Sequence, residues 1–138
     1  MMKEIASVMV LLALCVPALA VDIPNMVGNW TGTAHGADWY RYSTSDPIGK
    51  PIYWSGNYTI AISEQNGTAF SGKFINDAHP EISRVMLGVI GSDNKTIAMV
   101  AETTSYWGWL KSPTEMELFG SSFELESQDV GVCTFKKE

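Results

Sequence analysis

The chain has 138 residues, a length that favours one domain. Its formal net charge is −6, which makes it a poor partner for nucleic acid or an anionic membrane surface. The basic residues do not cluster, apart from Lys136 and Lys137 near the C-terminus. The acidic residues are dispersed, which is typical of the solvated strand faces of an exported domain.

The first twenty residues, MMKEIASVMVLLALCVPALA, have the form of a secretory signal peptide. Lys3 gives a positive start, residues 5–16 are apolar, and Ala18 and Ala20 provide the cleavage site. The alternative is a retained anchor, but the apolar run is shorter than the roughly 20 residues that span a bilayer. The sequence therefore predicts a signal helix over 1–20 and a secreted or extracytoplasmic domain over 21–138, with no membrane span after cleavage.

Signal removal would leave Cys133 as the single cysteine of the exported domain. Such a domain has no internal disulfide, so packing and strand pairing must hold it together. Cys133 lies in an apolar run, which favours a buried and inert thiol over a reactive one.

Strand patterns fill the exported part, and no convincing helix appears in it. The clearest is NYTIAISE at 57–64, where Tyr58, Ile60 and Ile62 share one face. Asn66-Gly67 then provides a strong signal for a two-residue hairpin turn. The predicted strands, in chain order, are 29–34, 57–64, 68–75, 84–90, 96–102, 106–110, 115–122 and 130–136.

Eight short strands joined mostly by tight turns predict an all-β, antiparallel up-and-down meander that closes into a barrel. The alternative architecture is a two-sheet β-sandwich. A barrel of about eight strands has an interior that is either filled by side chains or able to hold one small ligand.

Two connections are longer than the others: 78–83, which contains Pro80, and 35–54. The second is unusually rich in aromatic residues, and long ordered loops are usually functional. We predict it as the binding loop, although the same aromatics would also serve as a plug for one barrel end. The predicted ligand-binding residues are Trp39, Tyr40, Tyr42, Tyr53, Trp54, Trp107 and Trp109.

Trp107 and Trp109 share one strand face, with Gly108 between them on the other. If the tryptophans line the interior, they favour ligand binding. If Tyr106 and Leu110 fill the core instead, the tryptophans lie outside and favour a protein partner.

Catalytic and metal-binding signals are weak. No nucleophile motif or phosphate loop is present, so we predict a protein that is not an enzyme and uses no cofactor. Asp77, His79 and Glu81 would share a face if extended, but a surface turn is the simpler interpretation, and no metal site is predicted. A carboxylate pair that meets only in the fold stays open. Sequons occur at Asn29, Asn57, Asn66 and Asn94, and the sequence leaves their glycosylation open.

Gly28-x-Trp30 in a first strand, followed by the predicted meander, resembles the lipocalin and avidin-like small barrels. The resemblance implies that Trp30 closes one barrel end and packs against a basic residue of the last strand. Lys136 or Lys137 would take that role, and we name Lys136. The segments VGNWTGT, EQNGTAFSG, GSDNKTI and MEL also resemble a group of small exported prokaryotic proteins of unknown function.

Two departures from these families limit what the resemblance implies. Avidin-like proteins carry polar contacts to biotin two and six positions after the tryptophan, where this chain has Gly32 and Gly36. The cysteines of the lipocalins have no counterparts. The polar cradle for biotin is therefore absent.

The predicted function is an exported, non-catalytic binding protein with a small apolar or aromatic ligand in or at the mouth of a lipocalin-like barrel. The alternative is a protein- or surface-interaction module, inhibitor-like or adhesin-like, that uses the aromatic loop 35–54. An enzyme on a small barrel ranks last.

Overall fold

The structure is a computed structural model that describes residues 22–40, 50–124 and 127–138. The predicted signal peptide at 1–20, and Tyr42 with the rest of 41–49, lie outside the described residues. Within the described part, no helix is long and apolar enough to cross a membrane.

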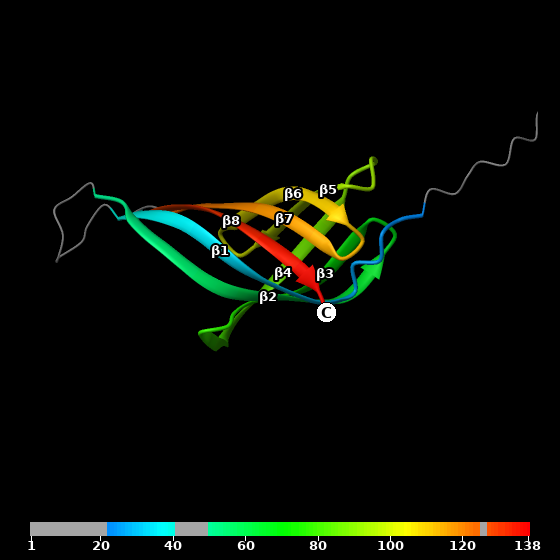
Figure 1. The fold of residues 1–138 in the computed structure, drawn as a ribbon, viewed down its shortest axis with the longest axis horizontal. Coiled ribbons are helices and arrows are strands. Elements are labelled where there is room, and N and C mark those ends of the chain that lie inside the picture. Colours follow the sequence, from blue (N-terminus) through cyan, green and yellow to red (C-terminus); the bar gives the residue numbers. More distant parts are fainter. Residues whose placement is uncertain (1–21, 41–49, 125–126) are drawn as a thin grey trace, which may run out of the picture.

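Eight antiparallel strands pair in chain order, and β8 returns to pair with β1, so the sheet closes into a barrel (Figure 1). The strands are β1 (Gly28–Tyr40), β2 (Ile52–Asn66), β3 (Ala69–Asn76), β4 (His79–Ile90), β5 (Thr96–Ala101), β6 (Thr104–Ser112), β7 (Glu115–Phe123) and β8 (Ser127–Lys137). The closed meander confirms the predicted barrel and rules out the sandwich. Closure gives each of these eight strands two neighbours, so none of the eight is an edge strand.

The strands β1 and β2 are much longer than predicted, and this corrects the predicted loop 35–54. Their pairing continues from Gly28 opposite Ile62 to Asp38 opposite Ile52. Of the described residues of this segment, 35–40 and 52–54 are strand, and here β1 and β2, with β8 paired to the other side of β1, form an arm (the β1–β2 arm) that extends beyond the barrel body (Figure 1). The physical reason is that Trp and Tyr favour strands, so the aromatics continue the ladder where we expected irregular chain.

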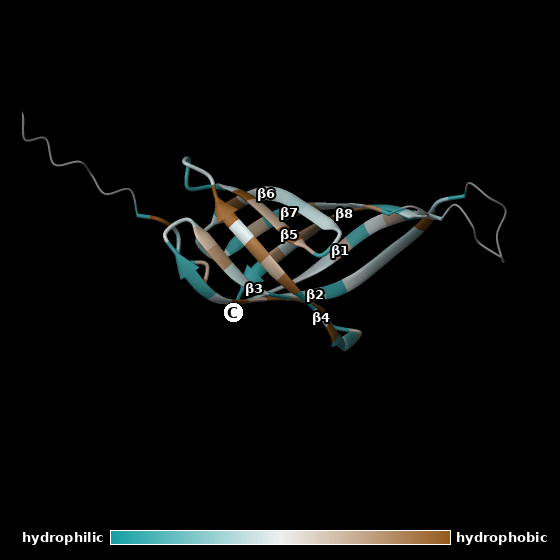
Figure 2. Cartoon of the chain, turned by 180° about the vertical axis from the view of Figure 1, so that it is seen from behind, coloured by the Kyte–Doolittle hydropathy of each residue, from teal (hydrophilic) through white to brown (hydrophobic). Residues whose placement is uncertain are grey.

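The predicted connection at 78–83 is also mostly strand. It forms the start of β4, and only Asp77 and Ala78 turn the chain between β3 and β4. Pro80 lies at the second position of β4, where a missing donor is tolerated near a strand start. Figure 2 shows apolar colour along much of β4, which has apolar residues on both faces.

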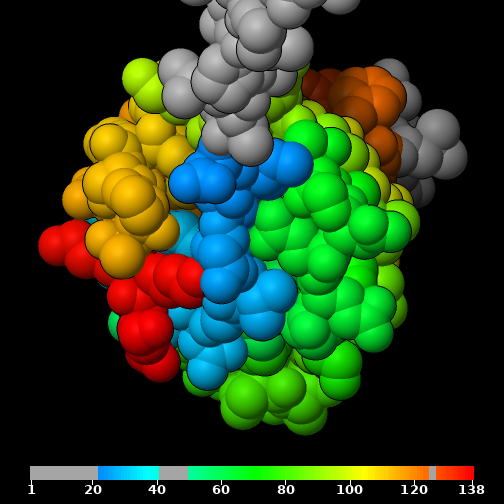
Figure 3. All heavy atoms as spheres, turned by 90° about the vertical axis from the view of Figure 1, so that its right-hand side faces the viewer, coloured from blue at the N-terminus to red at the C-terminus, as the bar shows by residue number. Residues whose placement is uncertain are grey.

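One end of the barrel is closed by a buried tryptophan. The Trp30 side chain is 0% exposed, and its Nε1 donates a hydrogen bond to the carbonyl of Met26 at 2.8 Å. The amide of Met26 donates to Oε1 of Gln65 at 2.7 Å, which holds the N-terminal segment across this end. Figure 3 shows that segment, in blue, lying over the barrel end.

Lys137, not Lys136, covers Trp30. The Lys137 ammonium lies 5.5 Å from the centre of the Trp30 ring, and it donates to the carbonyl of Asn25 at 2.8 Å. The two residues are partners in the β1–β8 register. Strand alternation explains the correction, because Phe135 and Lys137 point inward while the intervening Lys136 is exposed. Gly28 fits the close approach of Lys137: its φ is +135°, and a Cβ there would lie 3.0 Å from Lys137 Cε.

Candidate functional site

The other half of the barrel interior is hollow. A cavity of about 430 Å³ lies between β1, β2, β6, β7 and β8, with residues of β3 and β4 completing its wall. Its volume is in the range of small-molecule sites, roughly 300–1,000 Å³. The barrel is therefore filled at the Trp30 end and open towards the β1–β2 arm.

A chain of neighbouring aromatic rings forms the cavity wall. The ring centres of Trp54 and Tyr58 are 6.3 Å apart, and those of Tyr58 and Phe74 are 5.4 Å apart. Phe74 stacks on Tyr106 at 5.1 Å and meets the edge of Phe135 at 6.4 Å. Such rings give a broad apolar surface with fixed geometry, which suits a flat or aromatic ligand.

Inward-facing glycines make room for two of these rings. A Cβ on Gly36 would lie 2.3 Å from the Trp54 ring, and one on Gly131 would lie 3.1 Å from it. A Cβ on Gly120 would lie 2.8 Å from the Tyr106 ring. Trp54 thus lies flat across β1 and β8. The Trp54 ring also occupies the space that a polar side chain at position 36 would need, so this position could not carry a polar contact to biotin.

Two carboxylates lie at the mouth of the cavity. Asp38 and Asp129 are directly opposite each other in the β1–β8 register, and both line the cavity. Trp54 Nε1 donates to Asp38 Oδ1 at 2.5 Å, and the Tyr40 hydroxyl lies 3.3 Å from Asp38 Oδ2. The Ser122 hydroxyl donates to Asp129. Neutral donors therefore hold both carboxylates in place.

Arg84 contributes a positive charge on another part of the wall. Its Nε lies 3.2 Å from Oε2 of Glu102, so its charge is balanced locally. Glu102 lies in the turn between β5 and β6. Its φ is 52°, in the left-handed region that residues other than glycine adopt uncommonly.

Burial changes the acidity of three groups in the cavity. It raises the pKa of the Tyr106 hydroxyl to about 12 and that of the Cys133 thiol to about 12. Burial also raises the pKa of Tyr58, and the negative charge of Asp38 adds to that rise. Cys133 is buried, as expected, and its thiol stays protonated at neutral pH, which makes it a poor nucleophile.

The predicted aromatic residues of the arm do not act as one group. Trp54 faces the cavity, and Tyr40 reaches only its rim through the bond to Asp38. Tyr53 faces outward with 79% of its surface exposed. Trp39 borders a second hollow of about 560 Å³, which is lined mainly by outward-facing residues such as Ser105 and Val130 and which shares Asp38 and Asp129 with the cavity. We place the site in the interior cavity because its wall is aromatic.

Trp107 and Trp109 lie on the outer face of β6, not in the cavity. They are 55% and 39% exposed, while Gly108 and Leu110 are buried. Both tryptophans pack on Phe119 of β7, with ring centres 4.7 Å and 5.6 Å from it. Of the two arrangements considered for this strand, the structure thus has the one in which the tryptophans lie outside the barrel.

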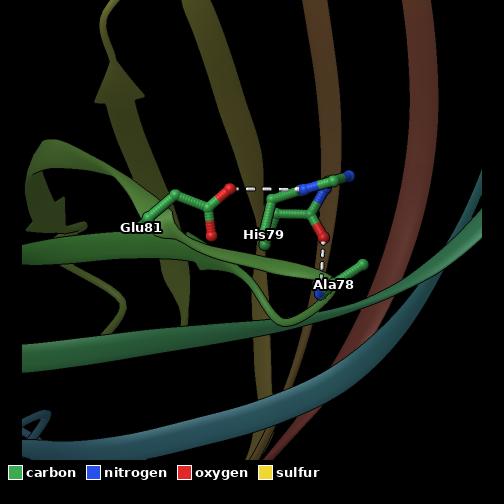
Figure 4. A network of polar contacts seen from close by, with 4 residues as sticks. Ala78, His79 and Glu81 are labelled. Carbon is green, nitrogen blue, oxygen red and sulfur yellow. Dashed lines mark hydrogen bonds and ion pairs between the residues drawn. The ribbon is translucent and has the colours of Figure 1, made fainter.

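The start of β4 around His79 is exposed and polar. His79 Nδ1 lies 3.4 Å from Oε1 of Glu81 (Figure 4), whereas Asp77 accepts a hydrogen bond from Thr59 at 2.8 Å. The three side chains therefore do not converge. No group of three or more His, Cys, Asp or Glu side chains within the described residues is placed to hold a metal ion.

Sequence reasoning missed four residues of the site: Asp38, Tyr58, Tyr106 and Asp129. Tyr58 was available from its alternation with Ile60 and Ile62, because those residues fill the interior. Tyr106 was considered only as a core residue. The carboxylates had no local signal, since their pairing exists only across the β1–β8 seam.

Comparisons with known proteins give similarity in structure only. No protein-family model matches the chain, and no curated protein matches it. A protein of unknown function from the DUF3598 family of Nostoc punctiforme is similar, with a TM-score of 0.48 and 14% identity over 86% of this chain and 49% of that one. The chain thus spans about half the length of that protein.

An S-type phycobiliprotein lyase from Guillardia theta is similar with a TM-score of 0.37 and 8% identity, over 82% of this chain and 88% of that one. Neither likeness assigns a ligand or an activity to this chain. The resemblance to the lipocalin and avidin-like families and to small exported prokaryotic proteins stays a prediction.

Proposed function

We propose that this chain is an exported, non-catalytic binding protein that takes a small apolar or aromatic molecule into the open half of its barrel. The cavity of about 430 Å³ with its aromatic wall is the observation that carries the proposal. Trp54, Tyr58 and Tyr106 supply the contact surface, and Asp38 and Asp129 supply polar contacts at the mouth. Few, well-placed polar groups in an apolar hollow are the usual composition of a ligand site.

Binding is favoured over catalysis because the nucleophile of the cavity is poorly activated. Burial holds the pKa of Cys133 near 12, so little thiolate exists at neutral pH. His79, which also borders the cavity, is exposed and pairs with Glu81. No base contacts the thiol among the described hydrogen-bond partners.

The test is a titration of the purified protein with N-phenyl-1-naphthylamine, a neutral apolar fluorophore. We expect saturable binding that Ala34→Phe weakens by about tenfold or more, because the new ring would fill the cavity floor. Ala61→Phe is the matched control, since Ala61 lies between the buried Ile60 and Ile62, on the outer face of β2, and should leave binding unchanged. Absence of binding, or equal binding by both variants, would contradict the proposal.

Protein binding through the outer face is a second candidate, favoured by the position of the tryptophans. Val89, Ala98, Trp107, Phe119 and Val132 form one cross-strand row from β4 to β8 on the outside of the barrel. Exposed apolar surfaces that contain tryptophan mark interaction sites.

A photo-crosslinking residue at position 107, introduced in the natural host, tests this second candidate. Position 73 on the outer face of β3, where Lys73 is exposed, serves as the control. A protein crosslinked at 107 but not at 73 would support a partner. Equal patterns at both positions would reject it.

A further inference from the structure

The opposed carboxylates at the cavity mouth point to the charge of the ligand. Asp38 and Asp129 occupy partner positions in neighbouring strands and face the same interior. Like charges directly opposite each other destabilise a sheet. A bound positive charge would remove this repulsion, because each carboxylate would then have a counter-ion.

The hydrogen bonds of this pair leave both charges in place. The donors to Asp38 are the Trp54 indole and the Tyr40 hydroxyl, and the donor to Asp129 is the Ser122 hydroxyl. All three donors are neutral, so they orient the carboxylates without balancing their charge. Each ionised carboxylate offers about four acceptor sites, so capacity for a ligand remains.

The arginine on the rest of the wall is engaged elsewhere, because Arg84 pairs with Glu102 at 3.2 Å. Nδ1 of His79 lies 3.4 Å from Oε1 of Glu81. Among ion pairs between described residues, none includes Asp38 or Asp129. The charge that these two carboxylates give the mouth is therefore negative. Burial is the main cause of the raised pKa of Tyr58, and the negative charge of Asp38 adds to it.

The ring next to these carboxylates suits a cation as well. Trp54 lies flat across Gly36 and Gly131, on the two strands that carry Asp38 and Asp129. An ammonium group near an indole face is attracted by the ring quadrupole. One end of the cavity thus offers two carboxylates and an indole, and the remainder offers Tyr58, Phe74 and Tyr106 for an apolar body.

We propose that the ligand is an aromatic amine in its cationic form, with its ammonium group between Asp38 and Asp129 and its ring system in the cavity. This inference rests on the proposed ligand-binding function and adds the charge of the ligand to it. The carboxylates set the preference for a cation, and the aromatic wall sets the preference for a flat apolar body.

Isothermal titration calorimetry with three matched probes tests the inference: indole-3-ethylamine, which is cationic, indole-3-ethanol, which is neutral, and indole-3-acetate, which is anionic. We expect the amine to bind at least about tenfold more tightly than the alcohol, since hydrogen bonds to charged groups are stronger than neutral ones. The acetate should bind least.

Four variants, one of them a control, locate the preference. Asp38→Asn and Asp129→Asn should each reduce the preference for the amine over the alcohol by several-fold, because each removes one negative charge from the mouth. Asp22→Asn is the matched control, because Asp22 is exposed in the N-terminal segment and does not line the cavity. Arg84→Gln should leave the preference for the amine intact or increase it.

The outcomes separate this inference from the function on which it rests. If the alcohol or the acetate binds as tightly as the amine, or if both Asp variants retain the full preference, the inference is wrong and the cavity still binds a ligand. Loss of binding in Arg84→Gln alone would mean that the ligand is an anion. If none of the three probes binds and N-phenyl-1-naphthylamine does not bind either, both proposals fail.

Discussion

The two ends of this barrel use the same architecture for opposite purposes. At the closed end, Trp30 is buried, its indole N–H is satisfied, and Lys137 covers its ring. At the open end, Trp54 lies over glycines beside a cavity, and two carboxylates face each other. One end is arranged for packing. The other keeps space and unbalanced charge, which lower stability and are expected at functional sites.

The difference depends on what lies inward at equivalent places in the strands. Near the closed end, inward positions carry Ile60, Met86, Ile97 and Met116, and all are fully buried. Near the open end, small or polar residues alternate with aromatics, so the rings stand beside empty volume. Packing a barrel end tightly and holding a ligand there are exclusive choices, because a core at native density has no room for a guest.

The largest expected effect is the loss of the closed end. Trp30→Ala should lower the free energy of unfolding by about 3–5 kcal/mol, the usual range for deletion of a large buried aromatic residue. Urea denaturation measures the change. A free energy of unfolding close to that of the wild type would show that Trp30 does not hold the barrel end.

Alkaline pH should destabilise the protein because the thiol of Cys133, which lines the cavity, is buried. The folded pKa of Cys133 is about 12, against an ordinary value of 9.0, so the folded state retains a proton that the unfolded state loses. The stabilisation is complete below pH 9 and decreases as pH rises towards 12, by about 2 kcal/mol over the first one and a half pH units.

Denaturation at several pH values above 9 checks this slope, and Cys133→Ala should flatten it. Tyr106, whose pKa is also raised by burial to about 12, adds a similar decrease above pH 10 and will remain in that variant. An unchanged slope in Cys133→Ala would assign the whole effect to other groups.

The aromatic residues of the β1–β2 arm should contribute less to the free energy of unfolding than Trp30 does. Replacing Trp39, Tyr40 and Tyr42 together by Ser should cost about 1 kcal/mol or less, since Tyr40 is exposed and Trp39 lies outside the packed core. Thermal melting compares this variant with Trp30→Ala. A drop of similar size would make the arm a plug of the barrel end and would remove its role in binding.

The smallest expected effect has the opposite sign. Asp129→Asn should stabilise the ligand-free protein by about 0.5 kcal/mol, because it removes one of two like charges in a cross-strand pair. The new amide oxygen can still accept the hydrogen bond from Ser122. A higher melting temperature supports this account of the open end, and a lower one contradicts it.

The sequence by itself determined the strand-forming segments and favoured a closed meander over the two-sheet sandwich. The alternation in 57–64 and the Asn66-Gly67 turn placed β2 and the start of β3, and eight such segments required a closed sheet to avoid edges. The boundaries of β1 and β2 could not be read in the same way. Aromatic residues at a strand end look the same in sequence whether they continue a ladder or form a loop.

Only the tertiary structure decided which face of each strand lies inside and which residues meet across the seam. Alternation put Trp107 and Trp109 on one face, but both faces of β6 carry large apolar residues, so periodicity gave no direction. Asp38 and Asp129 lie far apart in the chain and become partners only when β8 closes on β1. Their register is set by the hydrogen-bond ladder of the complete barrel, which no local pattern contains.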